Sequence, residues 1–359
     1  MRRSPNSLVF ICFTIFFHAL VVKAENPLAP ALYVFGDSLL DSGNNNLLPT
    51  IAKANYLPYG IDFASGVTGR FTNGKTVADY IAEQLGLPFA PPALSQFKSD
   101  IITGRNYASG SCGILPETGS QFGKCLNLDD QIDLFQKTIE MELQPHLGSS
   151  KELSDYLSKS IFVIAIGNND YISNYLEPNL FNTSETYTPQ AFAQLLGGRF
   201  SQGMERLYKL GARKILVFEI GTIGCMPTFA RKQQHEGPCV EELNQLVSLF
   251  NDGLPTMLKQ LTTSLQGSTF TVGQSSKLGY EMITNPSRYG LTDVTDPCCI
   301  AGSDGTWPCV PGFVSCFDVR KHAFWDAFHL TEIIYSTIGT RCFNDSSVCS
   351  PTIQQLVQV

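Results

Sequence analysis

The chain has 359 residues, of which 43% are hydrophobic and 16% are charged, and its formal net charge is −7. This composition is typical of a globular protein and excludes a disordered or collagen-like chain. So acidic a chain is also unsuited to binding nucleic acid by neutralising phosphates. Because α/β folds often exceed about 200 residues as one unit, we expect a single domain over residues 25–359.

Residues 1–24 have the pattern of a secretory signal peptide. Arg2 and Arg3 precede an apolar run over residues 8–22, which closes on a small-residue cleavage pattern at Ala24. The run is shorter than the ~20 residues that a membrane span requires, and no second run of that length follows. We therefore predict a secreted protein with no transmembrane anchor.

The mature chain would keep ten cysteines, an even number under oxidising conditions, so we expect disulfides rather than reactive thiols. The adjacent Cys298 and Cys299 are expected to have different partners, and the connectivity stays open. Paired Cys-x-x-Cys spacing is missing, so no zinc site is predicted. The close spacings that could form short loops are Cys225/Cys239 and Cys342/Cys349.

Asn182 and Asn344 each begin an Asn-x-Ser sequon without proline. In a secreted chain these are candidate N-glycosylation sites.

Short apolar runs that end near a glycine alternate with segments of helical periodicity along the chain. Such continuous apolar runs are typical of buried parallel strands, and the alternation predicts an α/β doubly wound sheet. Ligands of these sheets bind at the carboxyl ends of the strands. The predicted strands cover residues 31–35, 161–166, 215–220 and 270–272, and the predicted helices cover 77–85, 132–139, 195–207 and 243–254.

Ser38 follows the first predicted strand, which places a hydroxyl at a carboxyl end. A nucleophilic serine needs a base and a carboxylate that orients the base. Among the four histidines of the mature chain, only His329 has an aspartate, Asp326, three residues ahead within an apolar stretch. Helix capping by Asp37 and Ser38 is the alternative. We do not expect Asp37 to belong to the triad, because neighbouring side chains on an extended segment point in opposite directions. We expect it to anchor the loop instead.

Two further segments could stabilise an oxyanion. An Asn amide in residues 167–170, after a predicted strand, and the backbone N–H of Gly110 are candidate donors. The alternative for the Asn segment is an Asx turn.

Residues 69–76 match the Gly-x4-Gly-Lys-Thr pattern of a phosphate-binding loop. The preceding residues 62–68 are poor in apolar side chains, so the required buried strand is missing and we interpret the segment as a loop into the next helix. No serine lies in a Gly-x-Ser-x-Gly motif, which argues against the α/β-hydrolase fold.

Together these motifs resemble the secreted plant branch of the GDSL-motif esterase/lipases, in the SGNH hydrolase superfamily. The resemblance implies a flavodoxin-like three-layer α/β/α fold with a central parallel sheet, and hydrolysis of small-molecule or lipid carboxylic esters in the cell wall or apoplast without metal or cofactor. It covers nearly the whole mature chain. The matching segments are residues 36–39, 41–46, 69–75, 106–110, 167–170 and 324–329.

The resemblance also implies roles for individual residues. Ser38 would be the nucleophile, His329 the base and Asp326 its orienter, and the oxyanion donors would be the backbone N–H groups of Ser38 and Gly110 and the side chain of Asn169.

This chain departs from the family pattern at two places. Leu330 follows the histidine where proline is frequent, and Ser111 and Cys112 stand where Gly or Ala is common. A disulfide from Cys112, with Cys125 as its candidate partner, would reshape the oxyanion loop. The alternatives to an esterase are an extracellular acyltransferase that uses the same acyl-enzyme and a catalytically silent glycoprotein.

Overall fold

The computed structural model describes residues 26–95, 101–299, 304–312 and 314–359. The predicted signal peptide lies outside these residues. A mostly parallel six-stranded sheet forms the centre, and only its last strand, β8, runs antiparallel to its neighbour. In spatial order the strands are β2 (Gly104–Asn106), β1 (Leu32–Gly36), β3 (Ile161–Ala165), β4 (Lys214–Phe218), β5 (Thr269–Gly273) and β8 (Cys349–Ser350).

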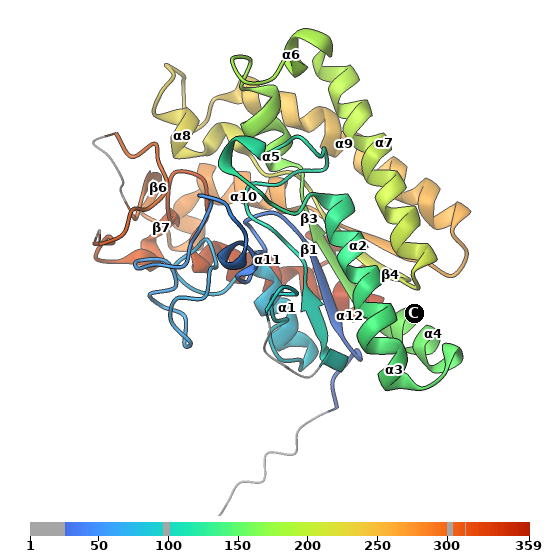
Figure 1. Ribbon diagram of the computed structural model, residues 1–359. Helices are drawn as coiled ribbons and strands as arrows, with labels where there is room; N and C mark the ends of the chain where they lie inside the picture. The colour runs from blue at the N-terminus through green and yellow to red at the C-terminus, as the bar shows by residue number, and fades with distance from the viewer. Residues whose placement is uncertain (1–25, 96–100, 300–303, 313) are drawn as a thin grey trace, which may run out of the picture.

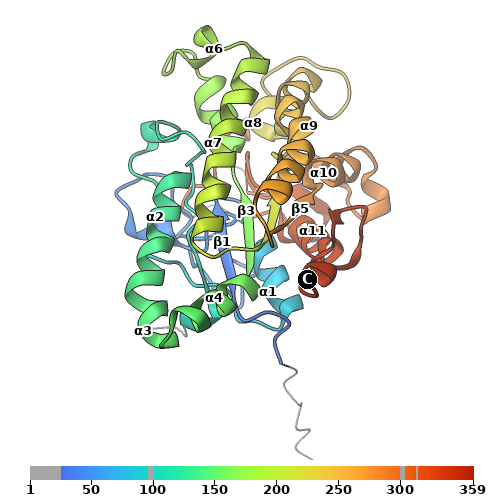
Figure 2. The same ribbon diagram turned by 90° about the vertical axis from the view of Figure 1, so that its right-hand side faces the viewer.

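Helices cover both faces of the sheet, as Figures 1 and 2 show. This burial explains the continuous apolar runs of β1, β3 and β4, whose residues are all buried. The three-layer α/β/α fold is therefore confirmed. One face carries α2 (Leu128–Thr138), α7 (Pro189–Lys209) and α9 (Glu241–Ser264), and the other carries α1 (Val77–Leu85), α10 (Ser275–Thr284) and α11 (Glu332–Asn344).

Shorter elements connect these layers. A second, two-stranded sheet pairs β6 (Asp293–Pro297) with β7 (His322–Phe324). The short helices are α3 (Gln144–Leu147), α4 (Ser150–Lys159), α5 (Asn168–Asp170), α6 (Thr183–Thr186), α8 (Pro227–Ala230) and α12 (Ile353–Leu356). In the described ranges, no helix combines the length and the apolar character that crossing a membrane would require.

The carboxyl end of β1 is held from two sides. Gln131 of α2 accepts a hydrogen bond from the Gly36 N–H at 2.8 Å and donates to the Gly36 carbonyl at 2.8 Å. A Cβ on Gly36 would lie 2.3 Å from the carbonyl oxygen of Ala165 in β3, so only glycine fits here. The chain therefore leaves the sheet in a fixed direction immediately before Ser38.

Five disulfides link ten of the eleven cysteines, and those at Cys298 and Cys299 staple the loop between β6 and β7. This agrees with the expectation that these adjacent cysteines have different partners. The pairs are Cys112–Cys125, Cys225–Cys239, Cys298–Cys316, Cys299–Cys309 and Cys342–Cys349.

Candidate active site

Ser38, His329 and Asp326 form one hydrogen-bonded chain at the carboxyl edge of the sheet. His329 Nε2 lies 2.7 Å from Ser38 Oγ, and its Nδ1 lies 2.8 and 2.9 Å from the two carboxylate oxygens of Asp326. Although Ser38 and His329 are 291 residues apart in sequence, the fold brings them into contact. The three side chains thus have the mutual distances that serine acyl transfer requires of a nucleophile, a base and an orienting carboxylate.

A single tight turn holds Asp326 and His329 together. The Asp326 Oδ1 atom accepts the backbone N–H groups of Phe328 at 2.9 Å and His329 at 2.7 Å, and the turn closes with a 2.7 Å bond from the Trp325 N–H to the His329 carbonyl. Asp326 is fully buried. Burial alone would raise its pKa, but the neighbouring His329 and the hydrogen bonds bring the pKa below the ordinary value. The carboxylate is therefore kept charged.

Tyr59 is a further contact of this carboxylate that the sequence did not reveal. Its hydroxyl donates to Asp326 Oδ2 at 2.5 Å and accepts the backbone N–H of Cys309 at 3.2 Å. The neighbouring Tyr56 donates to the Cys309 carbonyl at 2.7 Å. No motif marks Tyr59, which lies in an irregular loop 267 residues from its partner. The disulfide-stapled loop is thereby connected to Asp326.

The Asp37 carboxylate bonds to its own loop and to Asn168 and, in the described residues, makes no hydrogen bond to His329, which agrees with the expected anchoring role. Its carboxylate accepts the Leu39 N–H at 3.0 Å and the Asn168 side chain at 3.3 Å. Burial raises the pKa of Asp37 to about 6. Within the described part of the chain, the backbone N–H of Ser38 donates to no protein acceptor, so it is available to a ligand.

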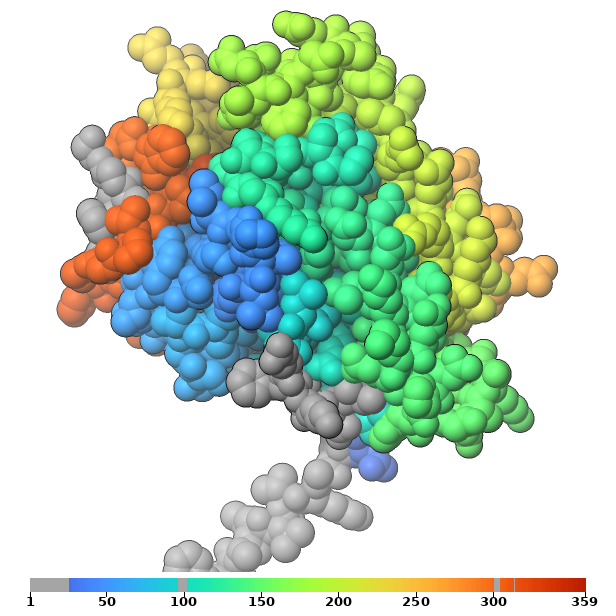
Figure 3. All heavy atoms as spheres, in the orientation of Figure 1, coloured from blue at the N-terminus to red at the C-terminus, as the bar shows by residue number. Residues whose placement is uncertain are grey.

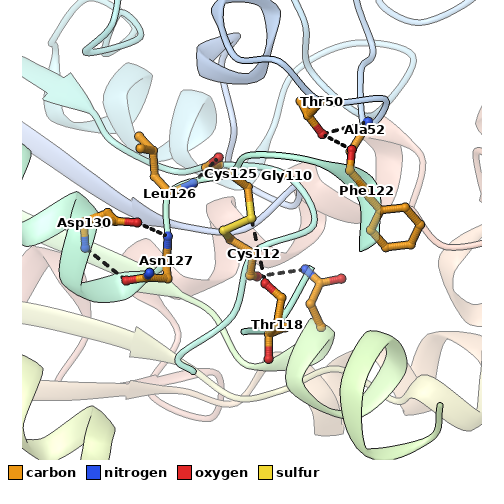
Figure 4. Close-up of a disulfide and its surroundings, with 12 residues drawn as sticks. Thr50, Ala52, Gly110, Cys112, Thr118, Phe122, Cys125, Leu126, Asn127 and Asp130 are labelled. Carbon is orange, nitrogen blue, oxygen red and sulfur yellow. Dashed lines mark hydrogen bonds between the residues drawn. A yellow bond between two sulfur atoms is a disulfide. The ribbon is translucent and has the colours of Figure 1, made fainter. Parts of the chain in front are cut away.

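Asn169 stands on the short helix α5, directly after β3. One of its amide hydrogens donates to the Cys112 carbonyl at 3.0 Å, which leaves the second for a ligand. Cys112 is in turn bonded to Cys125, and Figure 4 shows this disulfide beside Gly110 and Leu126. The disulfide that the departure at Cys112 suggested therefore braces the loop that orients the Asn169 amide.

Gly110 is engaged in a different contact. Its backbone N–H donates at 3.1 Å to Asp41 Oδ2, and its carbonyl accepts the Asn45 side chain at 2.9 Å. The next residue, Ser111, has a positive φ of 68°, and in the described residues its N–H has no protein acceptor. The predicted Gly110 donor thus stays a prediction, since in this conformation its hydrogen is directed to a carboxylate.

The segment that matches a phosphate-binding loop has a structural role. It follows turns rather than a strand and leads into α1, whose N-cap is Thr76. Lys75, the residue that would contact phosphate, pairs with Glu83 at 2.7 Å. Arg70 forms a buried ion pair with Asp79 at 2.7 Å. The segment is therefore a loop into α1, as expected.

An apolar cavity lies beside the three functional loops, between the sheet and helices α10 and α11. Leu39, Asn168 and Phe328, which neighbour Ser38, Asn169 and His329, line one part of it. The wall also includes Met226, Gly279, Met282 and Ile334. An apolar cavity of this kind suits the hydrocarbon part of a ligand.

Asn182 and Asn344, the two sequon asparagines, are exposed. Among the described residues, no group of three or more His, Cys, Asp or Glu side chains has the arrangement of a metal site.

Comparison with known proteins agrees with this geometry. Residues 32–341 match the family model described as GDSL-like lipase/acylhydrolase. The chain is similar to GDSL esterase/lipase 7 of Arabidopsis thaliana, with 45% identity over 330 residues that cover 90% of each chain. It is also 41% identical to GDSL esterase/lipase At1g71691 of the same plant, over 92% of this chain and 86% of the relative. This chain therefore belongs to the GDSL lipase/acylhydrolase family and is a hydrolase that acts on ester bonds.

Proposed function

We propose that the protein is a secreted carboxylic-ester hydrolase that works through Ser38, His329 and Asp326. The contact that supports this best is the 2.7 Å distance between Ser38 Oγ and His329 Nε2. His329 is bonded in turn to the buried carboxylate of Asp326. The signal-peptide pattern of residues 1–24, the exposed sequons and the five disulfides support export as a single glycosylated domain over residues 25–359.

In this mechanism His329 removes the Ser38 proton as Oγ attacks the ester carbonyl. The alkoxide of the alcohol leaves with that proton, and a water molecule activated by His329 then releases the acid from the acyl-enzyme. Asp326 holds the imidazole in the required tautomer and stabilises the transient imidazolium.

The oxyanion would form close to two donors that, within the described ranges, each keep a hydrogen without a protein acceptor, the Ser38 N–H and the Asn169 side chain. Gly110 completes the predicted set, but its N–H must first leave Asp41. The free N–H of Ser111 is the alternative donor of the same loop. Losing one such donor typically slows acyl transfer by about 10²–10³-fold.

The test is the intact mass of the secreted protein after treatment with a fluorophosphonate, compared with Ser38→Ala. We expect one adduct on the wild type and none on the variant, together with turnover of p-nitrophenyl esters by the wild type alone. Product analysis with an added alcohol distinguishes hydrolysis from acyl transfer. A folded wild-type protein with no adduct would contradict the proposal and support the silent-glycoprotein alternative.

A further inference from the structure

Large hydrophobic side chains are exposed in two short segments far more than elsewhere. Of the fourteen such side chains in the described residues, eight lie within residues 47–61 and 307–317. Single exposed hydrophobics are common on protein surfaces, whereas clusters mark interaction sites. We call these eight the apolar rim: Leu47, Ile51, Leu57, Ile61, Trp307, Val310, Val314 and Phe317.

The two segments of the apolar rim lie side by side on one face. Tyr56 and Tyr59 of the first segment bond to the carbonyl and the N–H of Cys309 in the second, at 2.7 and 3.2 Å. Figure 3 shows the first segment in blue next to the orange-red region that holds the second. The disulfides Cys298–Cys316 and Cys299–Cys309 staple the second segment. Hydrogen bonds and two disulfides therefore fix the backbone that carries the apolar rim.

The two segments of the apolar rim carry little charge of their own, although the Lys232 ammonium lies 5.7 Å from the centre of the Trp307 ring. Residues 305–317 contain no Asp, Glu, Lys or Arg, and residues 44–61 contain only Lys53. The Lys53 ammonium donates to the carbonyls of Asn45, Asn46 and Leu48 at 2.8, 3.1 and 2.9 Å. Backbone carbonyls thus hold the Lys53 ammonium in place, although the group keeps its charge. A surface of this kind fits an uncharged apolar phase better than an anionic membrane or a charged protein.

Hydrogen bonds also link the first segment of the apolar rim to the active site. Tyr59, which contacts Asp326, lies between the exposed Leu57 and Ile61. At the other end, the N–H of Ile51 donates to the Phe122 carbonyl at 2.8 Å, in the stretch between Cys112 and Cys125. The first segment therefore bonds to Asp326 through the buried Tyr59 hydroxyl and to the stretch between Cys112 and Cys125 through its backbone.

We propose that the apolar rim docks on a neutral lipid–water interface, so that the enzyme acts on aggregated lipid esters. This inference rests on the proposed ester hydrolysis for its purpose, whereas the docking itself requires no catalysis. On an interface, the esters would be presented beside Ser38 instead of having to dissolve first.

The first test measures binding of the Ser38→Ala protein to phosphatidylcholine vesicles by flotation and by tryptophan fluorescence. The chain has two tryptophans. Trp307 is 61% exposed and Trp325 is fully buried, so a shift of the emission to shorter wavelength on adding vesicles reports on the apolar rim. We expect flotation and this shift, and Trp307→Phe should remove the shift.

The matched comparison introduces Val314→Ser with Phe317→Ser, and separately Met141→Ser with Leu180→Ser. The latter two side chains are 75% and 59% exposed and lie outside the apolar rim. We expect at least tenfold weaker vesicle binding for the first pair and unchanged binding for the second. Equal binding by both variants, or no binding by the parent, would overturn the proposal. A dimer in solution that the first pair dissociates would instead assign the surface to a second copy.

Hydrolysis of a fully dissolved ester by protein with an intact Ser38 separates this proposal from the proposed function. Soluble-ester turnover without vesicle binding would reject the docking alone. Vesicle binding without turnover would reject the hydrolytic function and leave the docking intact. If both hold, the Val314→Ser, Phe317→Ser variant should keep its rate on the dissolved ester and lose at least tenfold on an emulsion.

Discussion

Replacing Tyr59 with phenylalanine removes the only side chain other than His329 that bonds to Asp326 in the described residues. The ring would still fill the same buried space, so the substitution isolates the hydroxyl. Asp326 Oδ2 would keep one partner, the His329 ring, while Oδ1 would keep its backbone donors. The carboxylate would become more basic and less firmly oriented.

The size of the effect follows from these contacts. A hydrogen bond to a charged group contributes about 1.5–3 kcal/mol. Because Asp326 keeps its other bonds, we expect roughly 1.4 kcal/mol of this to appear in the reaction barrier, which is about tenfold in kcat. A more basic carboxylate also holds the protonated imidazole more tightly, so the acid limb of kcat/KM should move to higher pH. KM should change little.

The assay is the pH profile of p-nitrophenyl ester hydrolysis, with Tyr56→Phe as the matched control. Tyr56 contacts the same Cys309 backbone but not Asp326, so its loss should lower stability without moving the acid limb. A Tyr59→Phe enzyme with wild-type kcat and an unmoved acid limb would refute the reasoning. An equal displacement in Tyr56→Phe would assign the effect to the loop as a whole.

Three further outcomes are expected. Asp326→Asn should lower kcat by several orders of magnitude with an unchanged circular dichroism spectrum, because an amide favours the wrong imidazole tautomer; near-normal turnover would exclude the triad. Replacing Cys112 and Cys125 together by alanine should reduce kcat more than KM by loosening the carbonyl that holds Asn169, and steady-state kinetics would show it. Burial raises the pKa of Asp170 to about 7, above its unfolded value, so its contribution to stability is lost as pH rises through about 7; thermal melting should show a higher Tm at pH 5 than at pH 8, and Asp170→Asn should flatten this difference.

Much of the fold was predictable because β1, β3 and β4 are buried on both faces, which leaves a continuous apolar signature in the sequence. Strand β5 is only partly buried and alternates threonine with apolar residues, so its signature is weaker. Strands β2 and β8 have only three and two residues and no such run, so their pairing depends on the finished sheet. The strand predicted over residues 215–220 was also too long, because β4 ends at Phe218, before the polar Glu219.

The site shows the same division between local and distant signals. Asp326 and His329 were predictable together because one turn makes their contact. The Tyr59 hydroxyl and the bond between Gly110 and Asp41 join segments 267 and 69 residues apart, and no local pattern encodes them. The exposure of the large hydrophobic side chains could not be predicted either, since a sequence does not say which leucine faces solvent.

The separation of 291 residues between Ser38 and His329 has a consequence for biosynthesis. Ser38 is translated near the start, while His329 emerges only with the last tenth of the chain. On the proposed mechanism, a nascent polypeptide is inert toward the lipids of the cell that makes it until translation is almost complete. A premature stop between residues 38 and 329 would yield a protein that has Ser38 but no hydrolytic activity.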